Sequence, residues 1–104
     1  MLFAVLFEDD DTKAEMRRRH MAAHLAFLEA NAGAVRAAGP LRDEAGAGAG
    51  GLWLVEAPDA AAVRALVEAD PFWPTGLRRS VRLLAWQQVF AEGRRVTVPP
   101  PASS

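Results

Sequence analysis

Two kinds of hydrophobic spacing alternate along this chain, and their order constrains the fold more than any other feature of the sequence. Residues 2–8 and 52–57 are short apolar runs rich in Leu, Val, Phe and Trp, which is typical of strands. From Thr12 to Gly33 the apolar side chains recur at helical intervals, and Thr12 and Glu15 have the spacing of a capping box. This part of the chain predicts a strand, a long amphipathic helix and a later strand.

The segment between the helix and residues 52–57 predicts an edge strand followed by a loop. Val35–Leu41 has the composition of a strand, but Gly39-Pro40 weakens its hydrogen-bond ladder, which favours a sheet edge or a bulge. Residues 42–51 interleave glycine with alanine and carry few core-sized side chains. We expect a flexible hairpin loop there.

The second half of the chain predicts one more helix and one more long strand. Pro58-Asp59 begins a helix, and the ring of Pro71 ends it at Asp70. Residues 81–90 are predicted as the fourth strand, and residues 95–98 as a short return strand after a turn.

The resulting βαββαβ order predicts an α+β domain of the ferredoxin-like kind, with a four-stranded antiparallel sheet and two helices on one face. We assign residues 1–98 to this domain and residues 99–104, rich in Pro and Ser, to a disordered tail. The first and fourth strands are apolar at nearly every position, so the open sheet face also needs cover. A homodimer through that face, of the dimeric α+β barrel type, is the expected solution.

Composition excludes several classes of function. Lys and Arg number 12 against 13 for Asp and Glu, so no strong field attracts nucleic acid or an anionic membrane. The apolar run at residues 1–7 is too short to span a bilayer. The chain has no cysteine, which removes disulfides, thiolate nucleophiles and zinc-thiolate sites. We predict a cytoplasmic protein with no nucleic acid or membrane partner.

His20 and His24 are the only histidines, and their spacing places both on one face of the first predicted helix. A catalytic zinc helix carries glutamate directly after its first histidine, whereas this chain has Met21, and no third His or Cys is present. We therefore predict no metal and no other cofactor. His20 lies beside three arginines, where a partly exposed helix residue is the ordinary interpretation.

His24 and Asp70 are the most informative polar residues. Leu25 and Leu28 place His24 at the border of the predicted core, where an imidazole can act as a proton carrier. Asp70 ends the second predicted helix, and an aspartate there can either orient an imidazole or bond only the local backbone amides of a turn. Spacing alone does not decide between these two roles.

Several short motifs, taken together and in order, resemble the YciI-like (YCII-related) family. They cover most of the chain up to Trp86: His24-Leu25-Ala26-Phe27-Leu28, Ala38-Gly39-Pro40-Leu41, Leu54-Val55-Glu56-Ala57 after the glycine-rich segment, and Ala69-Asp70-Pro71-Phe72 with Gly76-Leu77. The resemblance implies a ferredoxin-like fold, usually dimeric, with His24 and Asp70 as the catalytic pair. One branch of the family is associated with dehydrochlorination of a chlorinated hydroxyhydroquinone.

The same resemblance implies a small organic molecule as the ligand and identifies the residues that would line its site. Gly39, Pro40 and Phe72 match pocket positions, and the neighbouring Trp73 and His20 join them as candidate substrate-binding residues. Related sequences often carry arginine three residues before the histidine, whereas this chain has Met21. Arg17, two turns before His24, is the candidate replacement.

Two classes of function remain open at this stage. In the first, His24 is a general acid or base oriented by Asp70, and the chemistry is of the lyase or dehydrochlorinase type without a covalent nucleophile. In the second, the cleft binds a ligand without catalysis, because this fold hosts many unrelated functions. Other dimeric α+β barrel enzymes share the strand order, but the motifs favour the YciI-like family.

Overall fold

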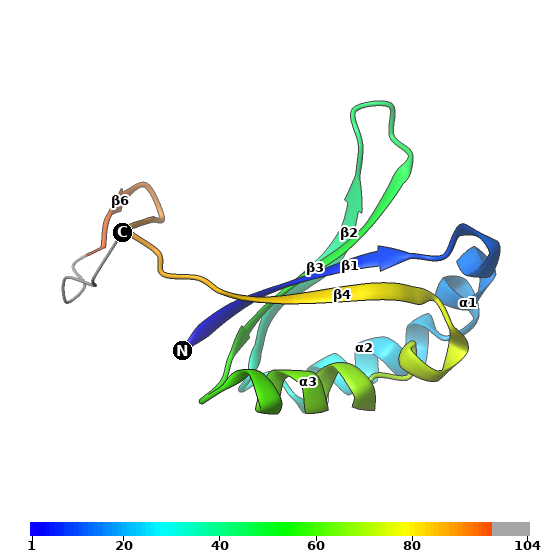
Figure 1. Cartoon of the computed structure of the whole chain (residues 1–104), viewed down its shortest axis with the longest axis horizontal. Helices are drawn as coiled ribbons and strands as arrows, with labels where there is room; N and C mark the ends of the chain where they lie inside the picture. Colours follow the sequence, from blue (N-terminus) through cyan, green and yellow to red (C-terminus); the bar gives the residue numbers. More distant parts are fainter. Residues whose placement is uncertain (97–104) are drawn as a thin grey trace.

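The computed structural model describes residues 1–96, in which helices cover one face of a four-stranded antiparallel sheet (Figure 1). The strands lie in the order β2-β3-β1-β4, which confirms the predicted ferredoxin-like arrangement. Their bounds are β1 Leu2–Asp9, β2 Val35–Arg42, β3 Gly48–Glu56 and β4 Arg78–Ala85. As predicted, β2 with its Gly39-Pro40 pair lies at an edge of the sheet.

The long helix predicted between Thr12 and Gly33 is interrupted. It consists of a short 3-10 turn, η1, and two α-helices that meet at His20, whose backbone φ of −107° and ψ of 9° are not helical. The bounds are η1 Asp11–Lys13, α1 Ala14–Arg19 and α2 Met21–Ala30. The predicted capping box does not form: Asp10 caps the first turn by accepting from the Thr12 amide, while Glu15 pairs with Arg18.

The second predicted helix agrees with its local signals. It is α3, Ala60–Ala69, and the Asp59 side chain caps it by accepting from the Ala62 amide at 2.9 Å. Asp70 then takes an extended conformation, with φ −65° and ψ 133°, as the following proline favours. A 3-10 turn, η2 Trp73–Thr75, leads into β4.

The core lies between the sheet and the helices. In β1, Phe3, Val5 and Phe7 are buried, whereas the alternate residues facing the other side are half-buried or, at Glu8, exposed. Trp53 and Val55 of β3 join the same core. The core includes two buried valines of α3, Val63 and Val67.

The bounds of two strands differ from the prediction because cross-strand pairing overrides local composition. β3 begins at Gly48, so the loop between β2 and β3 is shorter than predicted, and the Asp43 side chain holds it by accepting from the amides of Ala45 and Ala47. β4 spans residues 78–85 instead of 81–90, because its first residues pair with the end of β1.

The chain beyond β4 forms a small hairpin away from the helices (Figure 1). β5 Phe90–Ala91 and β6 Arg94–Arg95 pair around a turn at Glu92-Gly93. The predicted return strand thus begins at Arg94, and its residues 97–98 lie outside the described residues, as does the predicted tail at 99–104. Within residues 1–96, no helix is long and apolar enough to cross a membrane.

Candidate functional site

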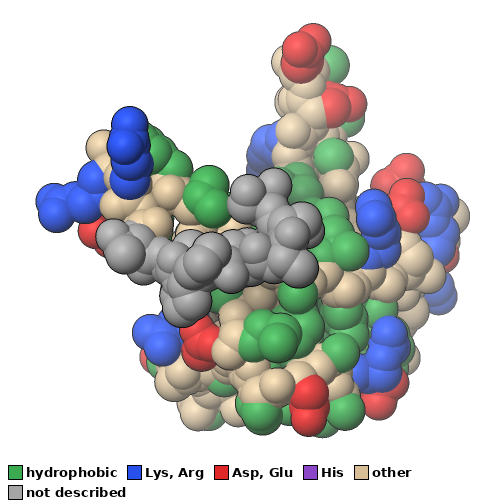
Figure 2. Space-filling model, turned by 60° about the vertical axis from the view of Figure 1, so that its left-hand side comes forward, with side chains coloured by type: hydrophobic (Ala, Val, Ile, Leu, Met, Phe, Trp, Pro, Cys, Tyr) green, Lys and Arg blue, Asp and Glu red, His purple; other side chains and the backbone are tan. Residues whose placement is uncertain are grey.

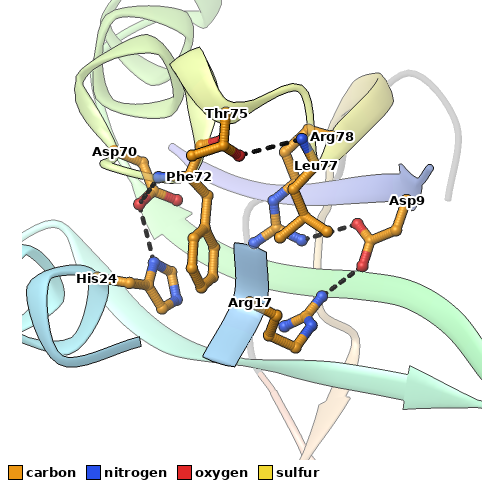
Figure 3. A network of polar contacts seen from close by, with 8 residues as sticks. All are labelled: Asp9, Arg17, His24, Asp70, Phe72, Thr75, Leu77 and Arg78. Atoms are coloured by element: carbon orange, nitrogen blue, oxygen red, sulfur yellow. Dashed lines mark hydrogen bonds and ion pairs between the residues drawn. The ribbon is translucent and has the colours of Figure 1, made fainter. Parts of the chain in front are cut away.

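His24 and Asp70 meet in the interior between α2 and the end of α3 (Figure 3). Nδ1 of His24 lies 2.9 Å from Oδ1 of Asp70, and the two side chains are 8% and 2% exposed. An ionised carboxylate can only accept, so Nδ1 carries the proton in this contact, and a neutral imidazole then has its lone pair on Nε2. No residue in the described range bonds Nε2.

Asp70 contacts both the imidazole and a local backbone amide, the two kinds of partner that the sequence left open. Its Oδ1 atom also accepts from the Phe72 amide at 3.1 Å, which is the local turn contact. The turn continues through Thr75, whose hydroxyl donates to the Phe72 carbonyl at 2.6 Å and accepts from the Leu77 amide at 3.1 Å. The turn therefore holds the carboxylate through contacts that do not involve the imidazole.

Phe72 lies at the centre of the site. Its ring stacks on the His24 imidazole, with centroids 4.1 Å apart and planes 17° from parallel. The guanidinium carbons of Arg78 and Arg17 lie 5.2 and 5.6 Å from the centroid of the Phe72 ring. The imidazole is thus held by a hydrogen bond at its edge and by an aromatic ring on one face.

A second polar cluster adjoins this pair and consists of two arginines around Asp9, the last residue of β1. Arg78 Nη1 donates to Asp9 Oδ1 at 3.1 Å, and Arg17 Nη2 donates to the other oxygen of the same carboxylate (Figure 3). The Arg78 side chain is only 3% exposed. Burial lowers the pKa of the Arg78 guanidinium, while the Asp9 carboxylate acts in the opposite direction.

Two hollows border these clusters. The smaller, of about 100 Å³, is lined by His24 and by three of the predicted binding residues, Arg17, Gly39 and Pro40. Its other lining residues are Met21, Leu25, Leu28, Ala38, Trp53 and Arg78. The larger is a groove of about 580 Å³ between the end of β1, helix α1 and the β2–β3 edge, and it shares Arg17 and Pro40 with the smaller cavity.

The structure does not bring every predicted binding residue to the cavity. Phe72 reaches the site through its stacking on His24. His20 is half-buried at the break between α1 and α2, and Trp73 packs against the hydrophobic core; neither lines the two hollows.

Sequence reasoning did not find Asp9 or Arg78. Asp9 lies in a run of three aspartates that is typical of a turn, and Arg78 precedes another arginine, so both have the pattern of solvated residues. Their pairing depends on the β1–β4 register, in which Asp9 lies opposite Arg78. No local signal predicts that register.

The acidic and histidine side chains do not gather into a metal-binding cluster. Within residues 1–96, no three His, Asp or Glu side chains lie close enough together to hold a metal ion. The carboxylate oxygens of Asp9 bind arginines, and Oδ1 of Asp70 binds His24 and the Phe72 amide.

Comparisons with known proteins agree with the fold. The sequence model of the YCII-related domain matches residues 1–87. Among solved structures, 5-chloro-2-hydroxyhydroquinone dehydrochlorinase (TftG) from Burkholderia phenoliruptrix AC1100, in complex with 2,5-dihydroxybenzoquinone, is 28% identical with a TM-score of 0.73. The alignment covers 84% of this chain and 94% of that one. No curated protein matches the chain.

Proposed function

The chain belongs to the YCII-related family, and on this premise we propose that it is a cofactor-independent acid–base enzyme acting on a small organic molecule. His24 is the general base and acid, and Asp70 orients it. The observation that carries the proposal is the buried contact of 2.9 Å between Nδ1 of His24 and Oδ1 of Asp70. A carboxylate in this position fixes the tautomer with a basic Nε2 and stabilises the imidazolium formed during reaction.

The reaction class follows from the groups present. Nε2 takes a proton from the substrate, the electron pair released forms a new double bond, and a leaving group departs with its own pair. This is an elimination, and it requires no covalent nucleophile. The related TftG enzyme is named for such a dehydrochlorination, which makes a chlorinated hydroxyhydroquinone the first substrate to test.

The substrate would reach His24 from the side of Arg17, Gly39 and Pro40, which line its cavity. The groove that shares Arg17 and Pro40 has about 580 Å³, a size in the ordinary range for small-molecule sites. Phe72 would keep the imidazole in place during proton transfer. His20 and Trp73 line neither hollow, so this path gives them no contact with the substrate.

The test is release of chloride from 5-chloro-2-hydroxyhydroquinone by the purified protein. We expect turnover by the wild type and a loss of roughly 10²–10⁴-fold in His24→Gln, because general acid–base catalysis contributes about that much. Asp70→Asn should fall between the two. Arg18→Ala is the matched control, since Arg18 lies on α1 near Arg17 but is exposed and pairs only with Glu15.

Chloride release that is unchanged in His24→Gln would contradict the assignment of the base. If the wild type binds the compound but releases no chloride, the second candidate function gains support, namely binding of a small ligand without catalysis. The larger groove favours that candidate, because its volume of about 580 Å³ is in the ordinary range for small-molecule sites and His24 is not among its lining residues.

The proposal includes a homodimer through the open sheet face. On that face Leu6 lies opposite Leu52, and Ala4 lies opposite Leu54 and Leu84. Leu84 is 39% exposed in the isolated chain. Figure 2 shows other hydrophobic side chains at the surface of the body, with charged side chains at its margins. Apolar surface of this kind favours association.

Sedimentation of the wild type at micromolar concentration tests the dimer, and a monomer there would exclude it. Leu84→Glu should shift the equilibrium toward monomer. Val89→Glu is the control, because Val89 is exposed near the β5–β6 hairpin and not on the sheet. The cytoplasmic location stays a prediction from the sequence.

A further inference from the structure

Arg78 is a buried cation that acid–base catalysis by His24 and Asp70 does not explain. Its guanidinium lies between two aromatic rings, with its central carbon 4.2 Å from the Phe7 centroid and 5.2 Å from the Phe72 centroid. It lines the same cavity as His24. A guanidinium is rarely buried to this degree without several hydrogen-bond partners.

The hydrogen bonds of Arg78 are incomplete. A guanidinium carries five N–H donors, and within residues 1–96 the one hydrogen-bond acceptor for them is Asp9 Oδ1. Nε is fully buried and has no partner there. A buried donor without an acceptor is costly, and an atom of a ligand in the cavity that Arg78 lines can accept from the guanidinium donors that Asp9 leaves free.

The charges around the cavity indicate the sign of the charge on that ligand atom. Arg17 and Arg78 share the single carboxylate of Asp9, and the charge of the Asp70 carboxylate also attracts the Arg78 guanidinium. With a neutral imidazole at His24, these two cations and two anions balance. When His24 gains a proton, the cluster has one positive charge in excess, which one bound anion would compensate.

We propose that Arg78, assisted by Arg17, forms an oxyanion subsite for the ionised oxygen of a flat, weakly acidic hydroxyl compound, a phenol or an enol. The O–H bond breaks, its proton forms a bond to Nε2 of His24, and the oxygen keeps the electron pair beside the guanidinium. The ring extends toward the groove past Pro40. This subsite rests on the proposed function only in naming His24 as the proton acceptor.

The test uses 4-nitrophenol, whose anion absorbs visible light and whose neutral form does not. At a pH below the pKa of the free phenol, adding wild-type protein should increase the anion absorbance to a saturating level. Arg78→Met should weaken binding at least tenfold and abolish this increase, while Arg78→Lys should retain part of it. Arg18→Met, which changes an exposed arginine of α1, should match the wild type.

A second measurement uses only wild-type protein, in case Arg78→Met fails to fold. Nitrobenzene has the same ring without the hydroxyl group, and it should bind at least tenfold more weakly than 4-nitrophenol. Equal binding of the two compounds, or binding of 4-nitrophenol without an increase in anion absorbance, would overturn the subsite. Failure of chloride release with anion binding intact would instead reject the proposed catalysis and leave the subsite standing.

Discussion

The buried polar network has two ends, each built around one aspartate, and the two differ in whether their charge can change. At one end Asp70 faces His24 and a backbone amide, so a proton can enter or leave through the imidazole. At the other end Asp9 faces two guanidinium groups, which donate hydrogen bonds and cannot accept them. Phe72 contacts both ends. The charge at the Asp70 end can therefore change, whereas the charge at the Asp9 end is fixed.

If the two ends differ in this way, removing the fixed charge of Asp9 has the largest effect on stability. Asp9→Asn leaves Arg78 buried beside Arg17 without its hydrogen-bonded counter-charge, and we expect a loss of about 4 kcal/mol in the free energy of unfolding. Urea denaturation measures it. Asp11→Asn, two residues along and exposed, is the matched control and should change stability little. A loss below about 1 kcal/mol at Asp9 would remove the distinction between the two ends.

The backbone that positions Asp9 can be displaced by a substitution that changes no charge. Gly50 of β3 has φ +93°, and a Cβ there would lie 1.8 Å from the Phe7 carbonyl oxygen. Gly50→Ala must displace the end of β1, and we expect about 3 kcal/mol of destabilisation. Gly48→Ala, in the same strand with open space around it, is the control. Equal stabilities of the two variants would show that the end of β1 adjusts freely.

At the Asp70 end, loss of charge should affect stability much less. Asparagine keeps an oxygen that can accept from the imidazole and from the Phe72 amide, so Asp70→Asn should cost about 1 kcal/mol. The same variant should keep the proton on Nδ1, which 15N chemical shifts of the two His24 ring nitrogens report, while it loses the negative charge that stabilises the imidazolium. A stability loss as large as that of Asp9→Asn would show that both ends carry fixed charge.

The smallest effect concerns Glu8, next to Asp9 but on the exposed side of the sheet. A hydrogen bond from the Ser80 hydroxyl, and then Arg79, lowers the pKa of Glu8 in the folded protein. A carboxyl with a lowered folded-state pKa stabilises the protein above its unfolded-state pKa, and this contribution disappears as pH falls through the folded-state pKa. The difference in unfolding midpoint between wild type and Glu8→Gln should therefore shrink on acidification.

Glu44→Gln provides the control for that series, because Glu44 lies exposed in the turn between β2 and β3. A wild-type advantage over Glu8→Gln that grows on acidification would reverse the sign and reject the role of the Ser80 and Arg79 contacts.

Local sequence signals predicted the elements whose causes are local. Asp59 caps α3 and Pro71 ends it at Asp70, and both effects act within a few residues. The break at His20 was missed because the apolar spacing continues through it. β4 was placed three residues late because Arg78, Arg79 and Ser80 are polar, and only their pairing with the end of β1 makes them strand residues.

The same distinction between local and long-range causes explains which residues of the site the sequence predicts. Local reasoning left Asp70 with two possible partners, and the family resemblance alone paired it with His24. The structure places the two in contact, although they are 46 residues apart in sequence. Arg78 remained undetected because neither its burial nor its bond to Asp9 has a counterpart in the sequence around it. The long-range part of the site therefore requires the strand register.

The ladder between β1 and β4 joins an early part of the chain to a late one, and this has a consequence for synthesis. Asp9 and Arg78 are 69 residues apart. At about 5–20 residues per second, a ribosome adds Arg78 several seconds after Asp9. Throughout that interval one side of β1 has no strand to pair with, and an unpaired apolar edge is a template for aggregation. We expect nascent chains that stall before residue 78 to depend on chaperones.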